Sequence, residues 1–87
     1  MKNKTVLVTG AATGIGRSTA ELFAAMGYQV ALGCNHSFAE GLRFARSLSE
    51  MGMSTMAVKA DLRQPDQVEA MFRQIESVWG GVDILIN

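Results

Sequence analysis

The sequence predicts an α/β protein in which helices cover both faces of a parallel sheet. Two observations support this class. Short apolar runs of strand length alternate with segments whose apolar residues recur at helical spacing, in the order βαβαβαβ. Glycine or proline also stands at most boundaries between these segments, where it starts or stops an element. Short apolar strands separated by amphipathic helices are typical of a parallel sheet.

The first strand is predicted over residues 5–9 and the first helix from Ile15 to Gly27. The run "TVLVT" is apolar and β-branched and ends at Gly10, which is typical of a buried strand. From Ile15 the apolar residues change to helical spacing, and Gly27 stops the helix. The residues expected to face the core share one side of this helix: Ile15, Thr19, Leu22, Phe23 and Met26.

The second strand is predicted over residues 28–34, and a second helix follows it. Ser37 and Glu40 have the S-x-x-E spacing of a capping box, in which each side chain bonds the backbone N–H of the other residue. We therefore expect the helix to begin there and to end at Gly52. Its inward side chains are expected to be Phe38, Leu42, Ala45, Leu48 and Met51.

The third strand is predicted over residues 54–60, and residues 82–87 form the fourth. Between them a helix starts at Gln64 and Pro65, because proline suits the first helical position, and Gly80 ends it. Right-handed crossovers then favour the strand order 3-2-1-4, which is the first half of a Rossmann fold. The inner stripe of the third helix is expected to be Val68, Met71, Phe72, Ile75 and Val78 or Trp79.

Length and charge exclude several classes of function. The chain has 87 residues, enough for one small domain. Eight basic and eight acidic residues balance without a basic stripe, which excludes a nucleic-acid partner. No apolar stretch approaches the roughly 20 residues of a membrane span, so no membrane partner is expected. The one cysteine cannot form an internal disulfide and nothing spaces ligands for a metal, which fits a cytoplasmic protein.

The fourth strand raises a question about completeness. It would be an unpaired edge of the sheet and is apolar at Val82, Ile84, Leu85 and Ile86. Natural proteins seldom leave such an edge bare. We therefore expect residues 1–87 to be an incomplete domain, which either continues in a longer protein or is completed by another chain.

The segment "TGAATGIG", residues 9–16, joins the first strand to the first helix. The first turn of a helix has free N–H groups and a partial positive charge, so a phosphate binds there if no side chain blocks it. We expect Gly10 to allow a tight turn, Gly14 to let a pyrophosphate approach, and Gly16 to let the helix pack closely on the sheet. The alternative is an ordinary glycine-rich turn, but its place at the first βα junction favours a dinucleotide site.

These residues, with two further motifs, resemble the short-chain dehydrogenase/reductase family. "TGAATGIG" resembles the T-G-x-x-x-G-I-G fingerprint of that family. "ADL" at residues 60–62 resembles the motif that follows the third strand there, and "VDILIN" resembles the strand that leads into an N-N-A-G motif, with Asn87 as its first asparagine. The three matches keep their order and together span the chain.

The resemblance implies a dinucleotide site with named residues. Asp61 would accept a hydrogen bond from the adenine amino group, the Leu62 backbone would meet the adenine ring, and Asn87 would lie beside the adenosine ribose. The alternatives are a solvated loop carboxylate for Asp61 and a strand end without a role for Asn87. The residues implied to hold the pyrophosphate lie in the glycine-rich turn: Gly10, Thr13, Gly14, Ile15 and Gly16.

The end of the second strand decides between NADP(H) and NAD(H). Folds that bind NAD place Asp or Glu there for the ribose 2′-hydroxyl. Here Cys34, expected to be a small buried hydrophobe, stands at that position. Asn35, His36 and Ser37 are donors at a helix start, which suits a 2′-phosphate. We therefore expect NADP(H), with NAD(H) as the alternative, although Thr13 stands where NADP-dependent relatives often carry a basic residue.

The resemblance also implies hydride transfer between the nicotinamide and a small-molecule carbonyl or alcohol. The expected substrate class is a 3-oxoacyl thioester. The full-length protein is expected to be a homo-oligomer. The acid/base tyrosine of the family stands in a Y-x-x-x-K pair. Here Tyr28 is followed four residues later by Leu32, so no catalytic residue is expected in this chain. The alternatives are a non-catalytic dinucleotide-binding half-domain and an S-adenosylmethionine methyltransferase, which would need an acid closing the second strand.

Overall fold

Strands and helices alternate along the chain in the predicted order. A computed structural model describes residues 4–87, so residues 1–3 of the domain expected over residues 1–87 lie outside the described part. The bounds of the elements are β1 (Thr5–Thr9), α1 (Gly14–Ala25), β2 (Gln29–Cys34), α2 (Phe38–Glu50), β3 (Thr55–Lys59), α3 (Pro65–Trp79) and β4 (Ile84–Ile86).

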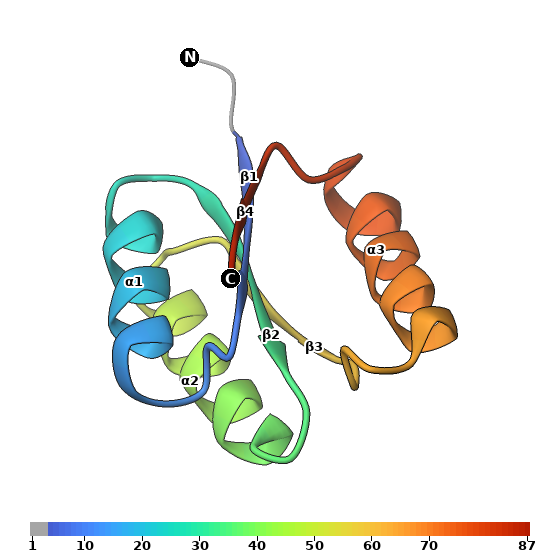
Figure 1. Cartoon of the computed structure of the whole chain (residues 1–87). Helices are drawn as coiled ribbons and strands as arrows, with labels where there is room; N and C mark the ends of the chain where they lie inside the picture. Colours follow the sequence, from blue (N-terminus) through green and yellow to red (C-terminus); the bar gives the residue numbers. More distant parts are fainter. Residues whose placement is uncertain (1–3) are drawn as a thin grey trace.

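The four strands form one parallel sheet in the order β3-β2-β1-β4, which confirms the predicted first half of a Rossmann fold. Leu7 at the centre of β1 lies opposite Ala31 of β2 and Leu85 of β4. Figure 1 shows α1 and α2 on one side of the sheet and α3 on the other. Helices therefore cover both faces, as predicted.

The core has two layers, one on each side of the sheet. Alternate residues of a strand face opposite sides, so Val6 and Val8 face α1 and α2 whereas Leu7 faces α3. Leu7 packs against Met71 and Ile75 in the second layer. The first layer also contains residues of β2 and of both helices: Val30, Leu32, Ala20, Ala24, Phe44, Ala45 and Leu48.

The inward face predicted for α1 is largely wrong. Ile15, Leu22 and Met26 are 87%, 60% and 59% exposed, whereas Thr19 and Phe23 are half-buried. The large apolar side chains of the helix therefore lie mostly outside its contact with the sheet.

Small residues at every fourth position form the actual contact between α1 and the sheet. These are Gly16, Ala20 and Ala24, and both alanines are buried. A Cβ built on Gly16 would overlap the carbonyl oxygen of Gly10 at the end of β1. The helix axis is therefore too close to the sheet for large side chains, which explains why the apolar pattern of the sequence pointed to the wrong face.

The face predicted for α3 agrees with the structure, whereas the face predicted for α2 agrees only in part. Ala45 and Leu48 are buried as expected, but Gly41 and Phe44, which were not assigned to this face, are buried too, and Leu42 is half-buried. Met51, at the end of α2, is 69% exposed.

At the end of α3, Val78 is 57% exposed, and Trp79 packs against the core layer that contains Leu7 and Ile75. Pro65 begins α3 as predicted, and Gly80 ends it with a φ of +87°.

The capping box predicted for α2 is not formed. Within residues 4–87, Ser37 is the N-cap but makes no side-chain capping hydrogen bond. Its ψ of 29° is not the extended conformation in which an N-cap side chain reaches the first turn. The helix begins at the predicted place, held by the backbone bond from the Gly41 N–H to the Ser37 carbonyl (3.0 Å).

Polar side chains tie the amino ends of three strands together. The Thr5 N–H donates to Asp83 Oδ2 (2.8 Å), and the Thr5 hydroxyl donates to Gln29 Oε1 (3.0 Å). These bonds connect β1 to the start of β2 and to the residue before β4. These polar groups at the amino ends of the strands therefore bond to one another.

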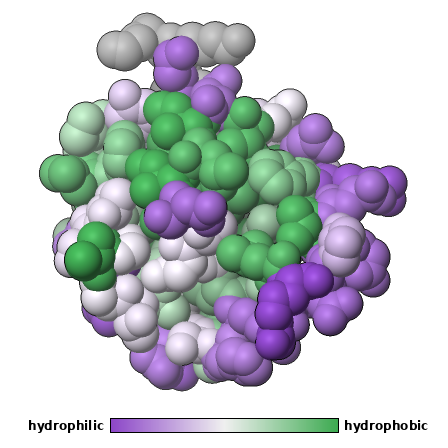
Figure 2. Space-filling model, viewed as in Figure 1, coloured by the Kyte–Doolittle hydropathy of each residue, from purple (hydrophilic) through white to green (hydrophobic). Residues whose placement is uncertain are grey.

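The outer edge of β4 is exposed, as the sequence predicted. Within residues 4–87, β4 pairs with β1 alone. Leu85 is 54% exposed, and Figure 2 shows apolar side chains gathered on the face over β4. Among the same residues, no helix is both long and apolar enough to cross a membrane.

We expect Gly16→Ala to destabilise the protein by about 1–3 kcal/mol, because the added methyl group would meet backbone that cannot rotate away. In an ordinary exposed helix the same change stabilises by about 1 kcal/mol, so the sign is informative. Urea unfolding followed by circular dichroism measures the effect. Ser18→Ala, at an exposed position of α1, is the control and should stay within about 0.5 kcal/mol. A more stable Gly16→Ala protein would contradict the close approach.

Candidate functional site

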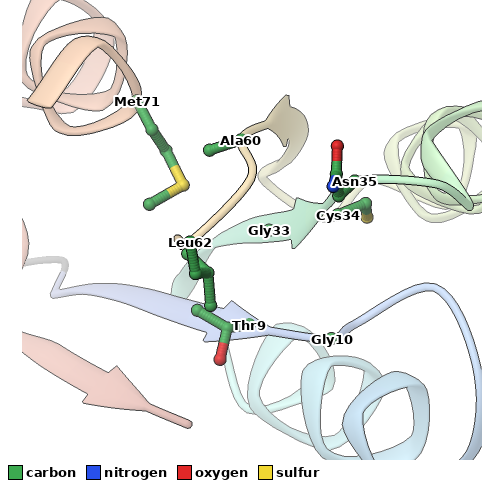
Figure 3. Close-up of a pocket in the computed structure, with 8 residues that line it drawn as sticks. All are labelled: Thr9, Gly10, Gly33, Cys34, Asn35, Ala60, Leu62 and Met71. Atoms are coloured by element: carbon green, nitrogen blue, oxygen red, sulfur yellow. The ribbon is translucent and has the colours of Figure 1, made fainter. Parts of the chain in front are cut away.

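A pocket of about 190 Å³ opens at the carboxyl ends of β1, β2 and β3 (Figure 3). Parallel α/β sheets bind their ligands at this edge. In Figure 3 the side chain of Met71 extends from α3 toward the space beside Ala60 and Leu62. The lining is mostly apolar and consists of Thr9, Gly10, Gly33, Cys34, Asn35, Ala60, Leu62 and Met71.

The glycine-rich turn lines this pocket through Gly10 and has open space in front of it. Gly10 and Gly14 have φ values of +64° and +59°, in the left-handed region that favours glycine. A Cβ at either residue would have no heavy atom within 4 Å, so the turn is open on that side. The Ala11 N–H donates to the carbonyl of Gly33 (3.2 Å), which fixes the turn against β2.

The first turn of α1 has uncovered amides. The N-cap residue Thr13 is extended (φ −143°, ψ 160°) and, within residues 4–87, makes no side-chain capping hydrogen bond. The first backbone bond of the helix runs from the Arg17 N–H to the Thr13 carbonyl, so the amides before it lack intrahelical partners. Gly14 and Ile15 are exposed. Free amides together with the helix dipole suit an anion here.

The segment after β2 carries the donors predicted for a 2′-phosphate. Asn35 is half-buried and lines the pocket, His36 is exposed, and Ser37 is half-buried at the start of α2. Cys34 is buried, as expected, and its thiol donates to the Leu32 carbonyl (3.5 Å). Burial raises the pKa of the Cys34 thiol. The Cys34 thiol therefore contributes to packing and is not activated as a thiolate.

Asp61 lies between two lining residues of the pocket, Ala60 and Leu62, and is paired with Arg63. Its Oδ1 accepts from the Arg63 N–H (3.0 Å) and Nε (3.1 Å), and its Oδ2 accepts from Nη2 (3.0 Å). The side-chain bonds from Arg63 lower the pKa of Asp61 most, followed by the backbone bond. The charges of Arg63 and His36 also lower this pKa, and together these effects bring it to about 2. The carboxylate is therefore ionised at neutral pH.

Asn87 is connected to the pocket through Thr9. The Thr9 hydroxyl donates to Asn87 Oδ1 (2.7 Å) and also lies 3.4 Å from the Ile86 carbonyl. An amide whose oxygen accepts this bond keeps its NH₂ group as a donor. Asn87 is thus held at the carboxyl end of β4, on the same edge of the sheet as the pocket.

The structure brings only some of the predicted site residues into one pocket. Gly10, Asn35 and Leu62 line it, and Asp61 and Asn87 adjoin lining residues. The remaining predicted residues do not line it, and lie in the turn, in the first turn of α1, or before α2: Thr13, Gly14, Ile15, Gly16, His36 and Ser37.

Sequence reasoning missed part of the lining. The sequence predicted only strand or core roles for Thr9, Gly33, Cys34, Ala60 and Met71, yet they line the pocket. The available signal was position, because the first four stand where predicted parallel strands end. Met71 had no such signal, since only the packing of α3 against the sheet places it there.

Arg17, the basic residue nearest the glycine-rich turn, packs against another helix. Its guanidinium lies over the ring of Phe44, 4.2 Å from the centroid, which is the geometry of a cation–π contact. It lines a second, polar hollow of about 250 Å³ together with Glu40, Arg43 and Ser47.

Among residues 4–87, no group of His, Cys, Asp and Glu side chains could hold a metal ion.

Comparison with known proteins shows that the chain belongs to the short chain dehydrogenase family, whose model matches residues 4–87. The 3-oxoacyl-[acyl-carrier-protein] reductase of Staphylococcus epidermidis is 36% identical over 85 residues, which are 98% of this chain and 35% of that relative. Galactitol 2-dehydrogenase of Agrobacterium fabrum is 36% identical over 87 residues, 100% and 32% of the two chains.

A solved structure agrees in fold as well as in sequence. FolM alternative dihydrofolate reductase 1 from Brucella suis, in complex with NADP, matches with a TM-score of 0.88 and 35% identity over 95% of this chain and 33% of that one. The chain thus spans about a third of the length of the curated relatives that it matches. The family resemblance seen in the three sequence motifs is confirmed.

Removal of Arg63 should raise the pKa of Asp61 from about 2 toward the ordinary value of about 4. Because the pKa is depressed in the folded protein, this pairing stabilises the fold above about pH 4, and the contribution is lost as the pH falls toward 2. Carboxyl-carbon NMR titration of Arg63→Ala measures the change. Arg73→Ala, which breaks the exposed ion pair with Glu69 on α3, should leave the titration of Asp61 unchanged. An unshifted Asp61 in Arg63→Ala would show that the pair does not persist in solution.

Gly41→Ala should destabilise the protein because its new methyl group would overlap the Cys34 thiol. In a Cys34→Ala background the same change should instead stabilise it, by the roughly 0.5–1 kcal/mol that alanine gains over glycine in a helix. Urea unfolding of the four proteins of this double-mutant cycle tests the reversal of sign. Additive effects would contradict a tight contact between α2 and the end of β2.

Proposed function

We propose that this chain is the cofactor-binding portion of an NADP(H)-dependent oxidoreductase that transfers hydride between the nicotinamide and a carbonyl or alcohol carbon. The observation that carries the proposal is the open glycine-rich turn, residues 10–16, with uncovered amides beside a mostly apolar pocket. A dinucleotide has both matching parts, an anionic pyrophosphate and a flat base. The turn and the first turn of α1 would hold the pyrophosphate.

The pocket suits the adenosine half of this ligand. Ala60, Leu62 and Met71 offer apolar surface to the adenine ring, and Asp61 offers an ionised acceptor to its amine. The free NH₂ group of Asn87 would donate to a ribose hydroxyl. These three features lie on the same edge of the sheet, as a single ligand requires.

The preference for NADP(H) rests on the charges at the end of β2. Asn35, His36 and Ser37 supply donors and no carboxylate, so a 2′-phosphate would be accepted rather than repelled. The carboxylate of Asp61 is already paired with Arg63. The NADP complex of the FolM reductase from Brucella suis, 35% identical, supports the same cofactor.

The substrate is proposed from the relatives. We propose a 3-oxoacyl thioester because the relative from Staphylococcus epidermidis is named a 3-oxoacyl-[acyl-carrier-protein] reductase. A relative of the same sequence identity is named galactitol 2-dehydrogenase, so a polyol is the alternative substrate class. We assign no catalytic residue to this chain, because Tyr28 lies at the amino end of β2 and packs edge-on against Phe23, with ring centroids 5.2 Å apart. By the same resemblance we propose a cytoplasmic homo-oligomer.

Calorimetric titration of the protein with NADPH, NADH and S-adenosylmethionine tests the cofactor. We expect NADPH to bind at least about tenfold more tightly than NADH, because its 2′-phosphate gains charge-assisted bonds at residues 35–37. Equal affinity for NADH would overturn the cofactor assignment, and preference for S-adenosylmethionine would overturn the class. Because no catalytic residue is assigned to this chain, oxidation of NADPH by a 3-oxoacyl thioester is measured with the full-length gene product, and activity there would exclude a non-catalytic dinucleotide-binding module.

Gly14→Val should abolish NADPH binding, because a branched side chain would stand where the pyrophosphate approaches the turn. The substitution also strains the backbone, since Gly14 has a positive φ. Gly52→Val is the matched control, because Gly52 has a φ of +93° and open space around it but lies between α2 and β3. The control should lose stability to a similar extent and retain binding. Intact binding by Gly14→Val would contradict the proposed docking of the pyrophosphate.

A further inference from the structure

Within residues 4–87, the Asp61 carboxylate is held by Arg63 alone, whose backbone N–H contacts Oδ1 (3.0 Å) and whose side chain contacts both oxygens. Two parallel contacts, Nε to Oδ1 (3.1 Å) and Nη2 to Oδ2 (3.0 Å), form a bidentate fork, which fixes the plane of the carboxylate as well as its position. The carboxylate side chain is only 18% exposed, whereas that of Arg63 is 80% exposed. The arginine therefore covers the outer side of Asp61 and has few other restraints.

The backbone around Asp61 is held by different groups. The Asp61 N–H donates to Gln67 Oε1 (2.8 Å), and the Asp61 carbonyl accepts from the Gln64 N–H (2.9 Å). Neither bond involves the guanidinium of Arg63. Loss of this guanidinium would leave Oδ1 with the bond from the Arg63 N–H (3.0 Å) but would remove the contact that holds Oδ2, while the loop that carries the carboxylate kept its shape.

We propose that Arg63 is a positioning residue that orients the Asp61 carboxylate toward the exocyclic amine of the bound adenine. The inference rests on the proposed function, since it takes the ligand of the pocket to be an adenine dinucleotide. It adds a residue that lies outside the three sequence motifs.

The hydrogen-bond geometry names the atom that receives the amine. Each carboxylate oxygen has about two acceptor sites. Oδ1 already accepts two bonds, from the Arg63 N–H and from Nε, whereas Oδ2 accepts one, from Nη2. Oδ2 is the oxygen with a free lone pair, so the adenine amine donates to Oδ2. The fork holds that lone pair in place before the ligand arrives.

The charge of Arg63 serves the same ligand. An unpaired carboxylate at the pocket would repel the phosphates of a dinucleotide, whereas the Asp61–Arg63 pair is neutral as a whole. This repulsion would act on any dinucleotide. The orientation of Oδ2, by contrast, matters only for a base that carries an amine, and this difference allows the two effects to be separated.

The test compares NADPH with its hypoxanthine analogue, in which an oxygen acceptor replaces the amine. Dissociation constants for both ligands are measured by calorimetry with the wild-type protein, Arg63→Ala, Arg63→Lys and Arg73→Ala. Arg73 is the matched control, because it is also an exposed arginine paired with a carboxylate, that of Glu69 on α3. Thermal unfolding of each variant checks that the fold is kept.

We expect the wild-type protein and Arg73→Ala to prefer NADPH over the analogue by about tenfold or more, as for a hydrogen bond to a charged group. In Arg63→Ala the preference should fall below about threefold. Arg63→Lys should behave like Arg63→Ala, because lysine keeps the charge but cannot form the fork.

A preference that is unchanged or larger in Arg63→Ala, with NADPH binding intact in the wild type, would overturn the role of Arg63 and leave the proposed function standing. Equal binding of the two ligands by the wild-type protein would also overturn it. Failure of the wild type to bind either dinucleotide would contradict the proposed function itself.

Discussion

The close approach of α1 to the end of β1 is the constraint on which the candidate site depends. It exists because Gly16 has no side chain and therefore leaves room for the carbonyl oxygen of Gly10. A helix held this close presents its first amides directly at the carboxyl edge of the sheet, next to the ends of β2 and β3. With a larger residue at position 16, the helix would have to move outward, and the anion-binding turn and the apolar pocket would no longer form one surface.

The two edges of the sheet have different roles. At the amino edge, Thr5, Gln29 and Asp83 satisfy one another and connect three strands. At the carboxyl edge, the polar groups near the pocket keep bonding capacity: the amides that start α1, the NH₂ group of Asn87 and one lone pair of Asp61 Oδ2. Stability and ligand binding are thus placed at opposite ends of the same strands, which is the general arrangement of parallel α/β proteins.

The electrostatics of the site suit a ligand that carries several negative charges. The carboxylate beside the pocket is Asp61, which the Arg63 guanidinium pairs, and the second strand ends in Cys34 without an acid. Cys34 is buried against Gly41, so the space that an acid would occupy there is used for packing α2 on the sheet. The cofactor preference that we propose and the packing of the second helix therefore depend on the same position.

The sequence by itself determined the class, the strand order and the family, because these follow from periodicity, from glycine and proline at boundaries, and from three local motifs. The glycine-rich turn and the donors after the second strand pointed to Gly10 and Asn35, and the family resemblance implied Leu62 and the adjoining Asp61. Only the tertiary structure decided which face of α1 is buried. The helix lies so close to the sheet that only glycine and alanine fit between them, whatever the hydrophobicity of the other residues. The tertiary structure alone also joined Met71 to the pocket and Arg63 to Asp61. A side chain's rotamer and its partners depend on three-dimensional packing, which local sequence patterns do not encode.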